Sequence, residues 1–198
     1  MTTVAALTLV LIAYALGCFT TGHYLARLRG TTTDRIASRS DSNDLSAWEF
    51  VLSFIIDLAK GAAPVLAARV LHLPPLGIVA CMIAVVGGHL WPVQLEFSGG
   101  KAIAPMTGAL LAFDHNIVLL LLLAVAILHL TNKQLMLSGL SGIALVPLFA
   151  AMLGHSALEV AGLTVLTLSV LWAHRDEIKE ILTEYGYRKP RPQNHSQQ

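Results

Sequence analysis

The chain has 198 residues, of which 55% are hydrophobic and only 13% are charged. Because soluble domains carry about a quarter charged residues, this composition excludes an ordinary soluble domain and indicates a polytopic membrane protein. The formal net charge is +1 and the basic residues are spread through loops rather than gathered in a stripe, so we expect no nucleic-acid partner.

Seven apolar runs follow one another along the chain, and we expect an all-α bundle of about seven transmembrane helices. A helix needs about 20 residues to cross a bilayer. The fourth run is shorter than that, so we expect it either to cross at a thin point or to form a re-entrant piece. The runs are Val4 to Leu25, Trp48 to Val70, Leu76 to Val93, Ile103 to Phe113, Ile117 to Leu130, Leu137 to Leu153 and Leu158 to Trp172.

The basic residues predict the orientation of this bundle. The first run has no Lys or Arg before it, whereas a secretory signal peptide begins with positive charges, so we expect an uncleaved first span with the N-terminus outside. Seven alternating spans then place the arginine-rich first loop, Lys101, Lys133 and the basic tail in the cytoplasm, and leave only Arg69 clearly outside. We expect one membrane-integral domain over residues 1–185 and a polar, disordered cytoplasmic tail over 186–198, which begins after an amphipathic helix.

Cysteine and histidine show no metal-binding pattern. Cys18 and Cys81 both lie inside apolar runs, where we expect them to be small buried hydrophobic residues. Four histidines, at positions 72, 115, 129 and 155, form no cluster with metal-ligand spacing. We therefore expect no metal site and no cofactor.

The segment EFSGGKAIAP, residues 96–105, interrupts the apolar chain with two glycines and a lysine. Backbone N–H groups of Gly99 and Gly100, with the charge of Lys101 beside them, suit an anionic group such as phosphate. The alternative is that the glycines only reverse the chain between two helices and that Lys101 is a cytoplasmic anchor.

Two charged residues lie inside the second run, three positions apart. Asp57 and Lys60 can meet on one face of a helix, and either alone costs about 2.5 to 3.5 kcal/mol at the centre of a transmembrane helix. We therefore expect both to face the bundle interior or water. They either neutralise each other to position helices or brace a polar site.

The remaining polar candidates lie at the ends of spans predicted to face the cytoplasm. His89 ends the third span, and His174 with Arg175 closes the last; each is a candidate for a site, or else a hydrogen-bonded helix end or interfacial anchor. Ser138 and Ser141 are one turn apart and either line a site or serve as small residues for helix packing.

Four fragments in a fixed order resemble the bacterial acyl-phosphate-dependent glycerol-3-phosphate acyltransferases, which are seven-span membrane enzymes of phospholipid synthesis. The most specific fragment has Gly-His, an aromatic residue and Pro-Val, followed after a short spacer by Gly-Gly-Lys. The resemblance covers nearly the whole chain. The fragments are DLAKGAAPVLAA at 57–68, GHLWPVQLEFSGGKAIAP at 88–105, SGLS at 138–141 and HRDEIKEIL at 174–182.

This resemblance implies the transfer of a fatty acyl group from acyl phosphate to glycerol 3-phosphate, giving lysophosphatidic acid. It implies a monomer in the bacterial inner membrane, in contact with lipid and with its active site facing the cytoplasm, and it requires neither a cofactor nor a metal. The residues it implies for catalysis are Lys101, His89, Ser138, Ser141 and His174. Those it implies for substrate binding are Gly99, Gly100, Arg35, Arg39, Ser42, Asn43, Asp57, Lys60 and Arg175.

The chain departs from the family pattern in its first cytoplasmic loop. The family has Gly-Ser-Gly-Asn there, whereas this chain reads RSDSNDLS around Asn43, with Ser42 in place of a glycine. Arg35 and Arg39 remain as phosphate partners, and the alternative role for Ser42 is to cap the second span. Ala102 also replaces a family glycine. The function classes left open are a divergent acyltransferase, a non-catalytic paralogue that binds a lipid or a phosphorylated ligand, and, less favoured, a small transporter.

Overall fold

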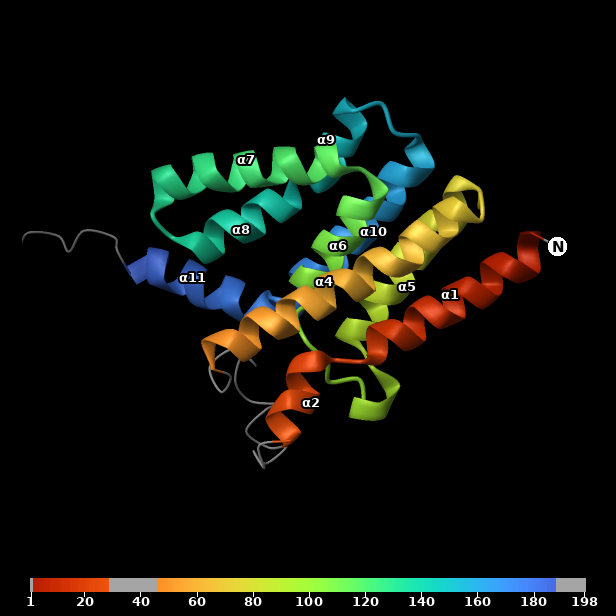
Figure 1. Ribbon diagram of the computed structural model, residues 1–198. Helices are drawn as coiled ribbons and strands as arrows, with labels where there is room; N and C mark the ends of the chain where they lie inside the picture. The colour runs from red at the N-terminus through yellow and green to blue at the C-terminus, as the bar shows by residue number, and fades with distance from the viewer. Residues whose placement is uncertain (1, 29–45, 188–198) are drawn as a thin grey trace, which may run out of the picture.

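The computed structural model describes residues 2–28 and 46–187, and every regular element in these ranges is a helix (Figure 1). This agrees with the all-α class expected from the apolar runs. The elements are α1 (Thr2–Cys18), α2 (Thr21–Leu28), α4 (Ala47–Val70), α5 (Pro75–Leu90), a 3-10 turn η1 (Val93–Leu95), α6 (Ile103–Phe113), α7 (His115–Asn132), α8 (Leu135–Ala144), α9 (Val146–Met152), α10 (Ala157–Ala173) and α11 (Arg175–Tyr187).

Three of these helices, α4, α5 and α7, are long and apolar enough to cross a membrane. The number rises to five if each of two bent pairs, α8 with α9 and α10 with α11, is one span. The expected first and fourth spans correspond to shorter apolar helices, α1 and α6. All seven predicted runs are therefore helical, but the count of seven spans stays a prediction.

The first predicted span is wrong in its extent. The sequence suggested one helix from Val4 to Leu25, whereas α1 ends at Cys18 and a separate short helix, α2, begins at Thr21. The sixth run, Leu137 to Leu153, is also bent, by 45° between α8 and α9. Pro147 lies at the start of α9, where it has no N–H to donate and its ring crowds the preceding turn, which accounts for the bend.

Glycine pairs allow the central helices to approach each other closely. A Cβ atom at Gly61 would lie 2.1 Å from the Pro105 carbonyl oxygen, and one at Gly108 would lie 1.9 Å from the Leu58 carbonyl oxygen, so α4 and α6 pack backbone to backbone. The pair Gly17 and Gly88 does the same for α1 and α5. Small residues are the usual means of tight helix packing in membranes, where lipid offers no hydrophobic driving force.

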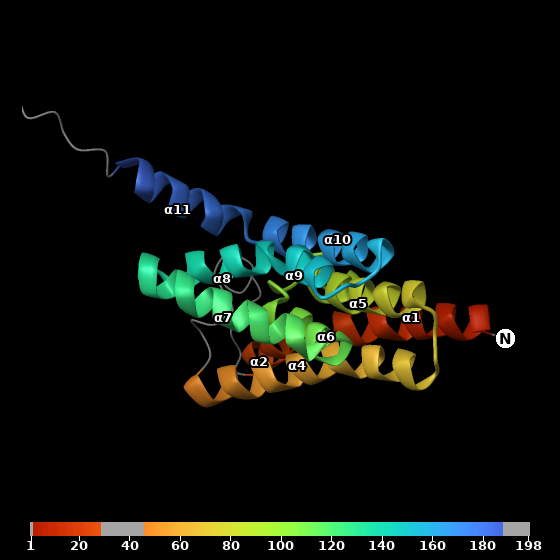
Figure 2. The same ribbon diagram turned by 90° about the horizontal axis from the view of Figure 1, so that it is seen from above.

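The short helix α6 lies at the centre of the bundle. Eight of its residues are buried, including Met106, Ala109 and Leu110, and Figure 2 shows α5 and α6 between α4 on one side and α10 on the other. At its far end, the Arg69 guanidinium donates hydrogen bonds to the carbonyl oxygens of Ala112 and Phe113, at 2.8 and 3.1 Å. Arg69, the one basic residue expected outside, therefore caps a helix C-terminus, where positive charge is favourable.

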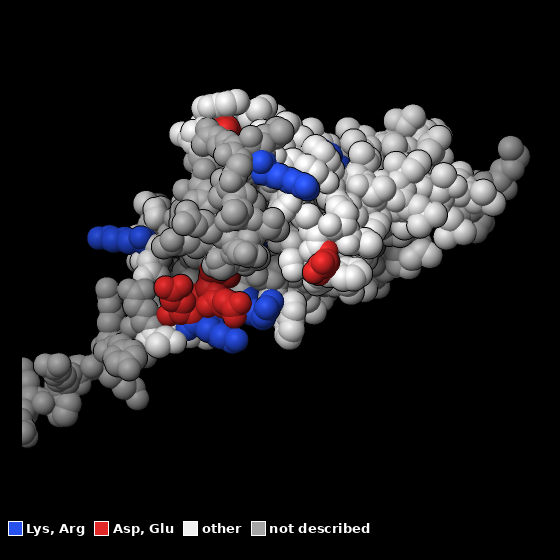
Figure 3. Space-filling model, turned by 90° about the horizontal axis from the view of Figure 1, so that it is seen from below, with Lys and Arg blue, Asp and Glu red and all other residues white. Residues whose placement is uncertain are grey.

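The two ends of the bundle differ in character. In Figure 1 the turns after α4, α6 and α9 lie toward the upper right and the N-terminus at the right, whereas α11 lies at the left and α2 near the bottom. Seen from below, charged side chains gather toward the end that carries α11, and the surface near α1 is almost entirely uncharged (Figure 3). On this face the charged side chains therefore lie mainly at the end of the bundle that carries α11.

Candidate functional site

A buried ion pair forms the innermost part of the polar end. The Lys60 ammonium lies 2.8 Å from Asp57 Oδ1, and the two side chains are only 7% and 11% exposed. This confirms that the two residues meet on one face of α4 and point into the bundle. Thr21, at the start of α2, donates a hydrogen bond of 2.9 Å to the same carboxylate oxygen. The pair therefore joins α4 to the junction of α1 and α2.

Lys60 also explains why α1 ends where it does. Its ammonium donates to the Phe19 carbonyl oxygen at 2.5 Å and reaches the Gly17 carbonyl oxygen at 3.5 Å. The Gln94 side-chain amide donates to the Cys18 carbonyl between them. The last carbonyls of a helix lack partners within the helix and carry partial negative charge, so these side chains stabilise the break. Periodicity along the first run does not reveal it, because the partners are about 40 and 76 residues away.

His89 is held in one orientation by the same lysine. The Lys60 ammonium lies 2.9 Å from His89 Nδ1, and His89 is 6% exposed. An ammonium has only donors, so Nδ1 accepts this hydrogen bond and the neutral ring carries its proton on Nε2. Lys60 thus joins Asp57, the end of α1 and His89 in one network.

The two glycines of the Gly-Gly-Lys loop lie directly on His89. A Cβ atom at Gly100 would lie 2.4 Å from His89 Nε2, and one at Gly99 would lie 2.1 Å from the His89 carbonyl oxygen. Neither glycine has a positive φ, so backbone conformation does not require glycine here. The close approach to His89 does, because it leaves no room for a Cβ atom. The positive φ in this loop falls on other residues, among them Ala102 at 58°.

The backbone N–H groups of these glycines are not free to hold an anion in this conformation. Gly99 donates to the Leu90 carbonyl at 3.2 Å, and Gly100 donates to the His89 carbonyl at 3.1 Å. The expectation that their N–H groups face a phosphate is therefore wrong for this conformation. The glycines instead let the loop fold back onto the end of α5, and this contact fixes the position of the backbone that leads into Lys101.

Lys101 lies at the edge of this arrangement, two residues before α6 begins at Ile103. Its side chain is 34% exposed, so its ammonium is accessible in a way that the ammonium of Lys60 is not. The N-terminus of α6 adds partial positive charge on the same side of the loop. Lys101 forms an ion pair with Glu177 in the first turn of α11, so it links the loop to the C-terminal helix.

The two candidate serines have different environments. Ser138 is fully buried, and its hydroxyl donates to the Gln134 carbonyl of its own helix at 2.8 Å. Ser141, one turn later, lines a pocket between α8, α10 and α11. Of the two, only Ser141 faces a space that a ligand can enter.

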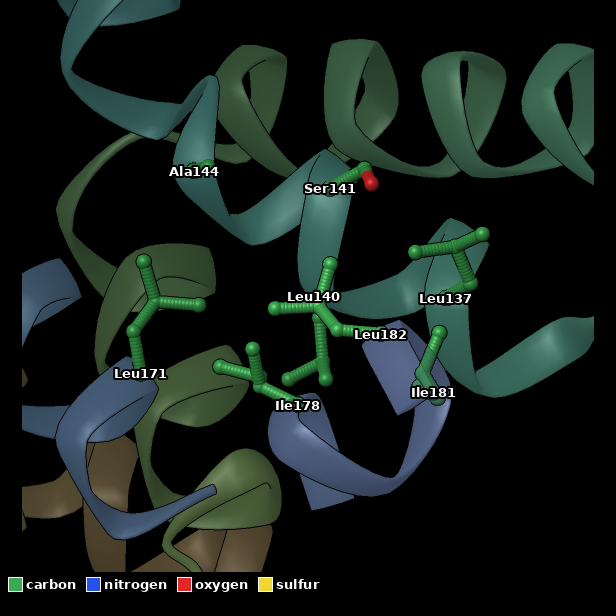
Figure 4. Close-up of a pocket in the computed structure, with 8 residues that line it drawn as sticks. All are labelled: Leu137, Leu140, Ser141, Ala144, Leu171, Ile178, Ile181 and Leu182. Atoms are coloured by element: carbon green, nitrogen blue, oxygen red, sulfur yellow. The ribbon is translucent and has the colours of Figure 1, made fainter. Parts of the chain in front are cut away.

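This pocket has a volume of about 210 Å³ and is almost wholly apolar. Figure 4 shows that its wall comes from α8 on one side and from the end of α10 together with α11 on the other. Its lining residues are Leu137, Leu140, Ser141, Ala144, Leu171, Ile178, Ile181 and Leu182. One lining residue, Ile178, directly follows Glu177, so the pocket and the ion pair with Lys101 both involve the N-terminal part of α11.

His174 lies at the junction of α10 and α11 and is 1% exposed. Its Nδ1 donates to the Val170 carbonyl at 2.8 Å, so in the neutral ring Nε2 is the acceptor. Arg175, the next residue, is 51% exposed at its side chain and stays at the surface, over the Trp172 ring and near Asp176. The structure therefore places His174 inside the bundle and gives Arg175 the contacts of an interfacial anchor.

Four predicted binding residues lie outside the described residues, so their positions relative to this site stay predictions. They are Arg35, Arg39, Ser42 and Asn43.

Sequence reasoning missed three residues of the polar end: Thr21, Gln94 and Glu177. Thr21 lies inside the first predicted span and the other two lie beyond the ends of predicted spans, and each acts on a partner 36 to 76 residues away. Only Glu177 carried a signal, since it lies within the HRDEIKEIL fragment beside His174.

Comparison with known sequences gives a consistent result along the chain. Residues 7–184 match the family described as glycerol-3-phosphate acyltransferase. Glycerol-3-phosphate acyltransferase 1 of Desulfitobacterium hafniense is 33% identical over 194 residues, which cover 91% of this chain and 93% of that protein. The glycerol-3-phosphate acyltransferase of Pseudomonas entomophila is 32% identical over 180 residues, covering 87% of this chain and 94% of that protein.

Solved structures show the same similarity in the fold. Two crystal structures of PlsY, an integral membrane glycerol 3-phosphate acyltransferase, superpose on this chain. The glycerol 3-phosphate form has a TM-score of 0.82 at 27% identity, and the lysophosphatidic acid form has a TM-score of 0.79 at 28% identity. Each covers 91% of this chain and 93% of that structure. These comparisons favour an acyltransferase over a non-catalytic paralogue that only binds a ligand.

Proposed function

The chain belongs to the glycerol-3-phosphate acyltransferase family, and from that membership we propose that it moves a fatty acyl group from acyl phosphate to glycerol 3-phosphate. The acceptor is supported by the names of the relatives and by the glycerol 3-phosphate form of PlsY. The donor is supported by the resemblance of the Gly-His and Gly-Gly-Lys fragment. The observation that carries the proposal is the accessible Lys101 ammonium, held by a loop that packs on His89.

The reaction needs an electrophile, a hydroxyl and a place for the leaving phosphate. The sn-1 oxygen of glycerol 3-phosphate attacks the carbonyl carbon of the acyl phosphate, and the bond from that carbon to the phosphate oxygen breaks. The hydroxyl proton leaves with inorganic phosphate, and the product is lysophosphatidic acid. Because the donor is a mixed anhydride with a good leaving group, positioning and charge stabilisation carry more of the catalysis than a general base.

Lys101 supplies the charge in this scheme. Its ammonium, together with the N-terminus of α6, binds the phosphate of glycerol 3-phosphate and lies next to the phosphate of the donor, whose negative charge it stabilises as that phosphate leaves. His89 acts differently: its Nδ1 accepts from Lys60 and its Nε2 lies under Gly100, so it holds the loop in place rather than removing a proton. Asp57 and Lys60 are positioning residues one step further in.

The apolar pocket under α11 is the proposed site for the acyl chain. Its lining residue Ile178 and the Lys101 partner Glu177 both belong to the N-terminal part of α11, which supports an acyl chain that extends from a phosphate at Lys101 into this pocket. Ser141 supplies the one hydroxyl in its lining. Ser138, whose hydroxyl is satisfied within α8, supports the helix instead.

We further propose the finer topology: seven spans, the N-terminus outside, and a monomer in the bacterial inner membrane with its site facing the cytoplasm. Seven apolar helices or helix pairs in chain order support it, together with the basic residues of the first loop and tail. In this arrangement Lys101 and Glu177 lie at the cytoplasmic interface, where soluble glycerol 3-phosphate and membrane-bound acyl phosphate can meet.

Release of inorganic phosphate by the purified chain tests the role of Lys101. With palmitoyl phosphate and glycerol 3-phosphate supplied in lipid or detergent, we expect Lys101→Ala to lose about 10²- to 10³-fold in rate, the usual effect of removing one charge-stabilising donor. Lys133→Ala, which removes an exposed lysine from the α7–α8 connection, serves as the matched control and should stay within about two-fold. Equal loss in both variants, or none in Lys101→Ala, would exclude Lys101 as the phosphate-binding group.

A further inference from the structure

The ion pair between Lys101 and Glu177 places a carboxylate on the group that the proposed function assigns to phosphate. The two residues lie 76 positions apart, in the Gly-Gly-Lys loop and in the first turn of α11, and their side chains are 34% and 22% exposed. Burial alone would raise the pKa of Glu177. The opposing effects are a hydrogen bond from Lys101, a hydrogen bond from the Glu177 backbone and the positive charges of Lys101 and His174, and they hold that pKa below its ordinary value. Glu177 is therefore ionised at neutral pH and occupies donors of the Lys101 ammonium.

An acidic residue in the first turn of a helix has an ordinary role, since it stabilises the positive end of the helix dipole. Asp176 already satisfies that role in α11: it is 72% exposed at its side chain and lies 3.5 Å from Lys179 and 3.9 Å from Arg175. The helix thus has two acids in its first turn, and only Glu177 contacts Lys101. Stabilisation of α11 does not account for the direction in which Glu177 points.

We propose that Glu177 is an intramolecular competitor for the phosphate-binding ammonium of Lys101 and thereby sets the affinity of the site for its phosphorylated acceptor. This inference rests on the proposed function, because it takes Lys101 as the group that binds phosphate. To bind, the acceptor phosphate displaces the Glu177 carboxylate from Lys101 and then lies next to a second negative charge. Both effects weaken binding, so the affinity is lower than Lys101 and the N-terminus of α6 would give by themselves.

Neutralising the carboxylate without changing its shape tests this competition. In Glu177→Gln we expect the dissociation constant and the KM for glycerol 3-phosphate to fall about ten-fold, an order-of-magnitude value for losing a competing charged hydrogen bond. We expect kcat to change much less, because Glu177 leaves Lys101 before the reaction. Asp176→Asn removes one negative charge from the same helical turn but no contact with Lys101, so it should leave both constants within about two-fold.

The double variant decides whether the effect passes through Lys101. Binding of glycerol 3-phosphate is measured by calorimetry on the purified full chain for wild type, Glu177→Gln, Asp176→Asn, Lys101→Ala and Lys101→Ala with Glu177→Gln. The inference expects Glu177→Gln to tighten binding in the wild-type background and to change nothing when Lys101 is absent. Glu177→Ala repeats the comparison if the glutamine variant is poorly folded.

Some outcomes would overturn the inference. Unchanged affinity in Glu177→Gln and Glu177→Ala would show that the carboxylate does not compete, and weaker affinity would show that Glu177 holds Lys101 in place for the ligand. If Asp176→Asn tightened the binding of glycerol 3-phosphate as much as Glu177→Gln does, the effect would come from the net charge near the site and not from competition for Lys101. If no variant transfers acyl groups but Glu177→Gln still tightens binding through Lys101, the proposed function fails and the competition stands. If the chain transfers acyl groups but Glu177→Gln leaves the KM for glycerol 3-phosphate unchanged, the proposed function stands and the competition fails.

Discussion

Replacing Lys60 with methionine removes the one cation from the buried network at the end of α1. In the folded chain this ammonium lies 2.8 Å from Asp57, 2.9 Å from His89 Nδ1 and 2.5 Å from the Phe19 carbonyl oxygen. Methionine fills a similar volume but offers no donor, so the Asp57 carboxylate keeps only the hydrogen bond from Thr21.

The size of the effect follows from what is left buried. Breaking a buried ion pair by removing one partner costs about 3 to 5 kcal/mol, because the remaining charge is uncompensated. For a chain of this length each kcal/mol lowers the melting temperature by about 2 to 4 °C, so we expect a fall of roughly 6 to 20 °C. Asp57→Asn combined with Lys60→Met removes the orphaned charge and should recover part of this loss. The unpaired carbonyl at the end of α1 still costs about 1 to 3 kcal/mol.

The chain carries its own probe for this measurement. Cys18 and Cys81 are free and buried, at 7% and 0% exposure, so a thiol-reactive maleimide dye reports unfolding as they become accessible. Melting curves of wild type, the single variant and the double variant in one detergent give the comparison. A Lys60→Met protein that melts within 2 °C of wild type, or a double variant less stable than the single one, would refute the reasoning.

Two further predictions concern the loop and the opposite end of the bundle. Gly100→Ala should lower activity at least ten-fold and shift the melting temperature far less than Lys60→Met, because its Cβ atom would lie 2.4 Å from His89 Nε2 and displace the loop. Gly139→Ala is the control, since nothing lies within 4 Å of a Cβ atom there. Equal activity in the two variants would contradict this prediction. At the other end, burial alone would raise the pKa of Asp114, but hydrogen bonds from a backbone N–H and from His155 hold that pKa below its ordinary value. A lowered pKa in the folded state stabilises the protein above the unfolded value of about 3.9, and this stabilisation disappears as the pH falls through the lower folded value. Asp114→Asn should therefore melt below wild type at pH 6, and the difference should disappear as the pH falls through the lowered pKa of Asp114, so a gap independent of pH would contradict the assignment.

Local pattern was enough to predict the helices and the buried pair. Each of the seven apolar runs predicted helical structure in the segment where it occurs, and the spacing of Asp57 and Lys60 within one run predicted that they meet on one face of the helix. These features depend on residues within one or two helical turns of one another, which periodicity and hydropathy describe directly.

Long-range contacts account for what the sequence did not reveal. The break after Cys18 depends on Lys60 and Gln94, and the orientation of His89 depends on a lysine from another helix. Hydropathy treats each helix separately, so it does not show that an ammonium from α4 caps the end of α1.

The Gly-Gly-Lys loop shows how composition can suggest a contact that the fold does not make. Its composition pointed to an anion site with free glycine N–H groups, whereas Gly99 and Gly100 bond to the end of α5 and let the loop approach His89. The accessible positive charge then comes from Lys101, whose partner Glu177 lies 76 residues away in α11. Which group a flexible lysine meets is decided by tertiary packing, and the loop sequence alone does not encode it.

The most direct test of the account is the balance of products formed by the purified chain. Palmitoyl phosphate and glycerol 3-phosphate are supplied together, and lysophosphatidic acid is quantified by mass spectrometry alongside the inorganic phosphate released. The account predicts one lysophosphatidic acid for each phosphate, with both products lost in Lys101→Ala. Phosphate released without an acylated glycerol phosphate, or no turnover of palmitoyl phosphate at all, would contradict it.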